Sequence, residues 1–143
     1  MGQYWIPVNL DKQEYIDPHK LGTGLKLWEQ VANHPGTGTA LIILCAAMPE
    51  KRGGGDLDMG DKDAKYNKIA KAVIGRWAGD RITLVGDYAE DTDLPPQFEA
   101  SKIYGECDTG GRFKDITDKV ARVIEHELVG HYEGDGWREF VSD

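Results

Sequence analysis

The sequence predicts an α+β domain with a mixed, largely antiparallel sheet and about three helices packed on one face of the sheet. Two observations lead to this prediction. Short runs with strand-like composition, such as residues 4–16 and 82–85, are bounded by turn-forming residues. Longer segments carry apolar residues at helical spacing, most clearly residues 115–128. We expect a single globular domain over residues 1–143, because this length can bury a core and the sequence contains no internal repeat.

The composition is that of an acidic globular protein. Its net charge of −8 argues against sequence-independent binding to nucleic acid and against binding to an anionic membrane. The apolar run at 40–48 is much shorter than the roughly 20 residues that span a bilayer, and the N-terminal residues do not resemble a signal peptide. There are only two cysteines, and Cys45 is expected to be buried in the apolar run. We therefore expect a reducing, cytoplasmic location.

The N-terminal segment is expected to form a β-hairpin. Residues 4–10 are one strand, Asp11 and Lys12 the turn, and residues 13–16 the return strand. Pro7 cannot donate a backbone hydrogen bond, which would place the first strand at an edge of the sheet.

Helical elements are expected to follow the hairpin. Asp17 and Pro18 are typical of an N-cap and a first helical residue, and apolar spacing predicts an amphipathic helix over about 24–32. Residues 39–48 are apolar throughout, so periodicity cannot separate a buried strand from a buried helix. The length of the run and its paired isoleucines favour a strand, with a helix left open.

The middle of the chain contains the segment 74–91, which we interpret as the central strand of the fold with a polar turn at each end. Residues 66–74 have helical spacing, and Gly75 is a suitable end for that helix. The alternative is a strand over 73–77 that pairs with 81–87 across a Gly79-Asp80 turn.

The C-terminal third is expected to contain a short strand at 102–107 and the clearest helix of the chain. This helix begins near Asp115, with Asp115 or Thr117 as its cap, and ends near Gly130.

A glycine-rich loop is the first candidate for a functional site. Three consecutive glycines follow Arg52 and precede Asp56. Such glycines allow backbone N–H groups to converge on an anion. Arg76 and Arg81 flank a turn that would supply further positive charge if it lay near this loop, while the alternative is a surface loop without function.

We therefore predict a cytoplasmic binding module for a small anionic, nucleotide-like molecule, with no cofactor. In this hypothesis Trp77 or Tyr88 stacks on the ligand, and Asp80 or Asp87 accepts a hydrogen bond from a hydroxyl group. The candidate ligand-binding residues are His19, Arg52, Gly53, Gly54, Gly55, Asp56, Arg76, Trp77, Asp80, Arg81, Asp87 and Tyr88.

Two other functions stay open. One is metal-dependent hydrolysis with Asp56, Asp80 or Asp87 as ligands and His19 as acid–base group. No metal site is expected at His126 and His131, because five positions separate them where a zinc-binding helix needs four. The other is an acidic interaction or inhibitor protein that engages a basic protein partner, with mimicry of nucleic acid as one form of this role. Self-association is also left open, and no direct nucleic-acid or membrane binding is expected.

Several polar motifs of this chain match the motif pattern of a protein family. They are residues 1–4, Val8 to Asp11, Tyr15 to His19, Gly53 to Asp56, Trp77 to Arg81 and Gly86 to Tyr88. With these motifs, the chain resembles a family of small uncharacterised bacterial and phage proteins over roughly residues 1–90 and the segment 115–117. The resemblance implies that these motifs belong to one recurring unit, and it carries over no catalytic residue.

Overall fold

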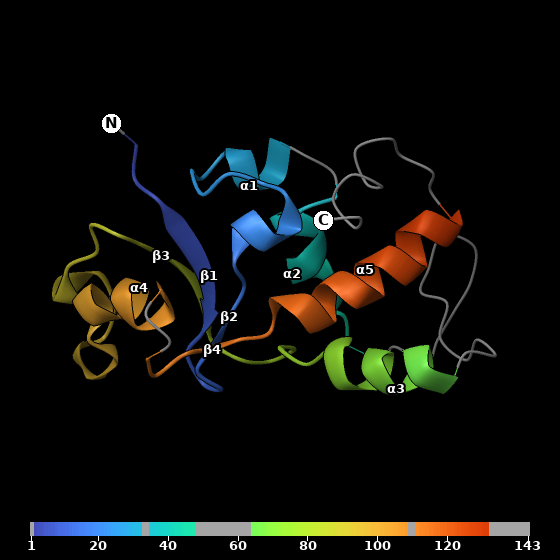
Figure 1. The fold of residues 1–143 in the computed structure, drawn as a ribbon. Coiled ribbons are helices and arrows are strands. Elements are labelled where there is room, and N and C mark those ends of the chain that lie inside the picture. The colour runs from blue at the N-terminus through green and yellow to red at the C-terminus, as the bar shows by residue number, and fades with distance from the viewer. Residues whose placement is uncertain (1, 33–34, 48–63, 109–110, 132–143) are drawn as a thin grey trace.

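The computed structural model describes residues 2–32, 35–47, 64–108 and 111–131. Within these ranges the strands form a four-stranded sheet of order β3-β1-β2-β4 (Figure 1). β1 (Trp5–Asn9) pairs antiparallel with both β2 (Glu14–Tyr15) and β3 (Ile82–Gly86). β2 pairs in parallel with β4 (Lys114–Asp115). The sheet is therefore mixed and mostly antiparallel, and the fold class is α+β as predicted.

The helices lie on both sides of this sheet. They are α1 (Glu29–Ala32), α2 (Thr37–Cys45), α3 (Ala64–Val73), α4 (Ala100–Asp108) and α5 (Thr117–His131). Figure 1 shows α4 on one side of the sheet, with α2, α3 and α5 grouped on the other. In the described part of the chain, no helix has the length and apolar character needed to cross a bilayer.

Two apolar clusters hold these layers together. The larger joins α2, α3 and α5 around Trp77, whose side chain is fully buried. The smaller lies between the sheet and α4 and includes Ile6, Val85 and Ile103. Successive residues of a strand point to opposite faces, so the sheet contributes to apolar packing on the α4 side through alternate residues of β1 and β3.

The predicted hairpin is confirmed, but the place of Pro7 at a sheet edge is wrong. β1 pairs on one side with all of β3 and on the other with only the two residues of β2. Pro7 accepts a hydrogen bond on the β2 side, from the N–H of Ile16 (3.1 Å). The nitrogen of Pro7 therefore faces β2, where the β1–β2 pairing ends at Tyr15. Because proline has no N–H group, at most one backbone hydrogen bond between these strands is lost.

The interpretation of 74–91 as the central strand is also wrong. Its strand part, β3, lies at the edge of the sheet, and β1 occupies a central place. The alternative strand over 73–77 is not formed, since α3 ends at Val73 and turns follow. Gly75 has a φ of +75° and donates its N–H to Ile43 (3.0 Å), and the N–H of Trp77 bonds Leu44 (2.9 Å). This turn is therefore fixed against the end of α2.

Residues 39–45 belong to α2, so the prediction of a strand over 39–48 is wrong, and Met48 at the end of that run lies outside the described residues. Gly36 is the N-cap of α2, and its N–H donates to Oγ1 of Thr39 (3.1 Å). The uniform apolar character reflects burial of Ala40, Ile43 and Leu44, while Ile42 is 73% exposed. Cys45, expected to be buried, is exposed.

Two further predictions are corrected. The helix over 24–32 is restricted to α1, because the backbone of Leu25 is engaged elsewhere: its carbonyl accepts the N–H of Trp5 (2.8 Å) and Nε2 of Gln30 (3.0 Å). The strand at 102–107 is instead part of α4, in which Ile103 and Cys107 lie one turn apart on the buried face.

The C-terminal helix is confirmed as α5. Oδ1 of Asp115 accepts the N–H of Thr117 (2.8 Å) and so caps its first turn. The helix extends to His131 and so passes Gly130, where it was expected to end. On α5, His126 stacks on Tyr66 of α3 with ring centroids 3.5 Å apart, and Tyr66 donates a hydrogen bond to the buried Glu127.

Candidate functional site

The polar motifs around residues 8–14 and 76–81 bind one another across the sheet. Asn9, which is fully buried, is at the centre of this contact. Its Oδ1 accepts the N–H groups of Asp11 (2.9 Å) and Lys12 (2.8 Å), and its Nδ2 donates to Oδ2 of Asp80 (2.9 Å). One amide side chain therefore shapes the hairpin turn and attaches it to the segment before β3.

Glu14 makes the second part of this contact. The carboxylate is 4% exposed and accepts hydrogen bonds from Nε (2.9 Å) and Nη2 (2.5 Å) of Arg76 and from Nε1 of Trp77 (3.0 Å). Burial raises the pKa of Glu14, but the hydrogen bonds from Arg76 and Trp77 outweigh it and hold the pKa below its usual value. The indole ring of Trp77 is thus part of the core and has no free face for a ligand.

Two more ion pairs complete the network. Arg81 binds Asp11 through its backbone N–H (2.6 Å), Nε (2.9 Å) and Nη2 (2.6 Å). Lys12 lies 2.5 Å from Oδ2 of Asp80. The hydrogen bonds from Arg81 lower the pKa of Asp11, and those from Lys12 and Asn9 lower the pKa of Asp80. Three cations and three carboxylates therefore neutralise one another here, and this charge balance favours a structural role for the network.

Of the residues proposed for a metal site, the structure describes Asp80, Asp87 and His19, and these three do not come together. Asp80 precedes the five-residue β3 and Asp87 follows it, so a strand about 17 Å long lies between them. Asp87 accepts the N–H of Tyr4 (2.9 Å). His19 is exposed and donates its backbone N–H to Asp17 (3.0 Å). Among the described residues no group of three potential ligands could hold a metal ion.

The remaining predicted residues have different outcomes. Arg52, Gly53, Gly54, Gly55 and Asp56 lie outside the described residues. Tyr88 is 61% exposed at the far end of β3 from Arg76 and Arg81. The structure therefore joins Arg76, Trp77, Asp80 and Arg81 in one network and leaves Tyr88, Asp87 and His19 apart from it.

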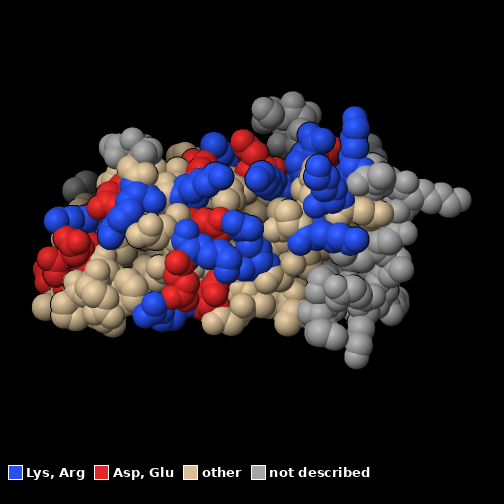
Figure 2. All heavy atoms as spheres, turned by 90° about the horizontal axis from the view of Figure 1, so that it is seen from below, with Lys and Arg blue, Asp and Glu red and all other residues tan. Residues whose placement is uncertain are grey.

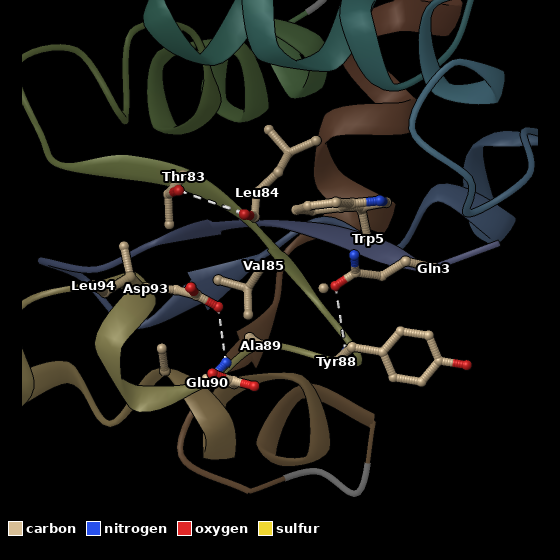
Figure 3. Close-up of a pocket in the computed structure, with 12 residues that line it drawn as sticks. Gln3, Trp5, Thr83, Leu84, Val85, Tyr88, Ala89, Glu90, Asp93 and Leu94 are labelled. Carbon is tan, nitrogen blue, oxygen red and sulfur yellow. Dashed lines mark hydrogen bonds between the residues drawn. The ribbon is translucent and has the colours of Figure 1, made fainter.

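A cavity of about 550 Å³ lies at the outer edge of β3, and Tyr88 belongs to it. Its wall includes Gln3, Trp5 and Leu84, together with the carboxylates of Glu90 and Asp93. Figure 3 shows Trp5 and Leu84 on one side of the β3 ribbon, with Glu90 and Asp93 on the other. The cavity therefore encloses the strand edge from both faces.

The cavity is acidic in character. Among the residues that the structure describes, no lysine or arginine lines it. Oδ2 of Asp93 accepts the N–H of Glu90 (2.8 Å), but neither carboxylate forms an ion pair with any residue that the structure describes. A ligand here meets negative potential, in contrast to the anionic ligand expected from the sequence.

Sequence reasoning missed most of this cavity. Gln3 and Trp5 meet the end of β3 only because β1 and β3 pair with Trp5 opposite Gly86, 81 positions along the chain. No local motif signals such a pairing. Of the lining residues, the sequence predicted only Tyr88 as a candidate for ligand binding, and its proximity to an aromatic residue of β1 could not be inferred.

Comparisons with protein-family models, with curated proteins and with solved structures found no match.

Proposed function

We propose that this protein is a binding module and that its ligand occupies the cavity at the edge of β3. The observation that carries the proposal is the cavity itself, whose volume of about 550 Å³ lies within the range of roughly 300–1,000 Å³ that is typical of small-ligand sites. It combines the apolar and aromatic surface of Trp5, Leu84 and Tyr88 with a few polar groups, as such sites usually do.

The charges around the cavity define the ligand class. Glu90 and Asp93 have no cationic partner in the described part of the chain, and Tyr88 presents an exposed ring that favours contact with a cation. The ligand is therefore expected to combine an apolar or aromatic group with a positively charged or neutral polar group.

A matched pair of small molecules tests this proposal. Phenethylamine and 3-phenylpropionate share the same ring and differ in the sign of their charge. In ¹⁵N-labelled protein, phenethylamine should shift the backbone amide signals of residues 83–90, and 3-phenylpropionate should shift them much less. Absence of amide shifts at 83–90 with phenethylamine contradicts the proposal, and so does an equal response to both molecules.

A variant and its control strengthen the test. Trp5→Leu should weaken the phenethylamine response, because Trp5 forms one wall of the cavity. Trp28→Leu is the matched control, since Trp28 is 77% exposed and does not line the cavity. A similar loss of response in both variants contradicts the site.

Binding of a small anion is a second candidate function. It is supported by a different observation, the lysine and arginine side chains on one face of the molecule. The face that carries α3 and the β1–β2 turn has many lysine and arginine side chains with carboxylates between them (Figure 2). Lys68 and Lys71 of α3 are exposed and form no ion pair with a described residue. Arg76 and Arg81 are on nearby turns but already bind Glu14 and Asp11.

Pyrophosphate and ATP are the probes for this second candidate. Either should raise the thermal midpoint of unfolding and shift amide signals of α3 and residues 76–81. Lys68→Gln with Lys71→Gln should remove the effect. No rise in the midpoint at saturating pyrophosphate or ATP contradicts this candidate and leaves the cavity proposal unaffected.

A further inference from the structure

β3 has one side free of β1, and the hydrogen bonds at its ends show which groups face outward. The N–H of Leu10 donates to the carbonyl of Arg81 (2.8 Å), and the N–H of Asp87 donates to the carbonyl of Tyr4 (2.9 Å). In an antiparallel pair the residues alternate between facing the partner and facing away. Odd-numbered residues of the segment therefore bond to β1, and even-numbered residues point away from it.

The outward groups are the N–H and C=O of Ile82 and Leu84 and those of Gly86. The carbonyl of Gly86 accepts the N–H of Ala89 (3.2 Å), and that of Leu84 has only a long contact with Oγ1 of Thr83 (3.5 Å). Within the ranges that the structure describes, the other outward groups have no hydrogen-bond partner. An unpaired edge of this kind can accept another strand.

The two sides of the cavity differ in the chemistry that they offer to such a strand. Leu84 and Trp5 lie on one face of the sheet, because Leu84 is opposite Pro7 and Trp5 is opposite Gly86 in the pairing. Glu90 and Asp93 lie on the other side of the β3 ribbon (Figure 3). Side chains of an added strand alternate between these two sides, so one set meets an apolar surface and the next meets carboxylates.

We propose that an extended peptide with alternating apolar and basic side chains adds as a further strand to the free edge of β3. The inference rests on the proposed function, because it places this peptide in the same cavity. Backbone hydrogen bonds to Ile82 and Leu84 hold the peptide, its apolar side chains contact Trp5, and its lysine or arginine side chains reach Glu90 and Asp93.

A second copy of this chain is a poorer occupant of the edge. Pairing of β3 with β3 would place Glu90 and Asp93 of both molecules in one interface, since an interface with twofold symmetry is formed by the same surface patch of each molecule. Like charges at an interface are unfavourable. The net charge of −8 adds to this repulsion, whereas it attracts a basic peptide.

The first experiment uses an acetylated and amidated hexapeptide of sequence Gly-Leu-Lys-Leu-Lys-Gly and two analogues. One analogue carries N-methyl groups on both leucines, the other on both lysines. Only one edge of an added strand faces β3, so one analogue should lose about tenfold in affinity and the other should bind like the parent. Equal losses in both analogues, or no loss in either, overturn strand addition.

The second experiment tests recognition of the basic side chains. Glu90→Gln with Asp93→Asn keeps the hydrogen-bond acceptor for the N–H of Glu90 and removes two charges. The affinity for the hexapeptide should fall about fivefold, and the affinity for an analogue with glutamine in place of lysine should not change. The control is Asp118→Asn with Glu125→Gln, which removes two charges from exposed positions of α5. An equal loss in control and test variants overturns this recognition.

The outcomes separate the two proposals. If phenethylamine shifts the amide signals of residues 83–90 but the hexapeptide does not bind, the cavity proposal stands and strand addition is overturned. If neither molecule binds, both are overturned. Concentration-dependent self-association that Leu84→Lys abolishes, measured by sedimentation, would overturn the peptide as occupant in favour of a second copy.

Discussion

The indole Nε1 of Trp77 donates a hydrogen bond of 3.0 Å to Oε1 of Glu14, a residue 63 positions earlier in the chain. Both side chains are buried, with exposed fractions of 0% for Trp77 and 4% for Glu14. The same carboxylate also binds the guanidinium of Arg76. A single acid therefore attaches the β1–β2 hairpin to the turn that precedes β3.

Replacement of Glu14 should test this attachment. Glu14→Ala leaves the buried indole N–H without an acceptor and Arg76 without a counter-charge, so the free energy of unfolding should fall by about 3 kcal/mol. The value is at the low end for a buried pair because the side chain of Arg76 is 39% exposed. Urea denaturation measures the change. Glu14→Gln should lower the free energy of unfolding by less, because its carbonyl oxygen can still accept the hydrogen bond from Trp77. An equal decrease in both variants would contradict this account.

Acid should weaken the fold through the same residue. The pKa of Glu14 in the folded state is below its usual value of 4.5, so the folded state binds fewer protons than the unfolded state. The stabilisation is therefore present above the unfolded pKa and is lost as the pH falls through the folded pKa. Between about pH 5 and pH 3, wild-type protein should lose more unfolding free energy than Glu14→Gln. Parallel curves for the two proteins would show that Glu14 does not contribute.

Alkali should act through Tyr15. Burial, with a further contribution from Asp115, raises the pKa of its hydroxyl group to about 12 from 10.0. The folded state then keeps a proton that the unfolded state loses, so stability is complete below pH 10 and falls as the pH rises toward 12. Tyr15→Phe should reduce this alkaline loss. Tyrosinate absorbance of the two proteins, followed with unfolding between these pH values, measures the effect.

The elements of this fold could be predicted where local chemistry determines them. The hairpin, the capped start of α5 and the apolar face of α3 all follow from spacing and turn residues, and each is present. The segment 39–48 could not be assigned, because an apolar run has no period to distinguish helix from strand. In α4, however, the spacing of Ile103 and Cys107 was a visible helical signal.

The site was less predictable because it depends on pairing between distant segments. The sequence identified the polar motifs that contain Asp11 and Arg81, but their mutual ion pair joins residues 70 positions apart. Arg81 therefore appeared available for an anion when it was already bound to a carboxylate. Likewise, composition cannot show whether β3 is central or at an edge, and the cavity exists only because it is at an edge.

Two glycines before β3 should respond differently to replacement by alanine. Both have positive φ, +75° for Gly75 and +81° for Gly79. A Cβ at Gly75 would lie 2.6 Å from the backbone oxygen of Ala46, whereas nothing lies within 4 Å of one at Gly79. Gly79→Ala should cost about 1–2 kcal/mol from backbone strain alone. Gly75→Ala should cost clearly more, because α2 must also move. Urea denaturation of both variants measures the difference, and equal costs would contradict the predicted clash.

Gly86 offers a way to change the cavity without unfolding the protein. A Cβ at this position would lie 1.8 Å from Oε1 of Gln3, which also contacts the N–H of Tyr88 (3.4 Å). The obstacle is the end of a flexible side chain, so Gly86→Ala should displace Gln3 and change stability little. The displaced side chain should move into the cavity that it lines, so the amide shifts caused by phenethylamine should decrease. Gln3→Ala in combination with Gly86→Ala removes the conflict and should restore part of the response. Failure of the second substitution to restore any response would mean that Gly86 acts through the backbone of β3 and not through Gln3.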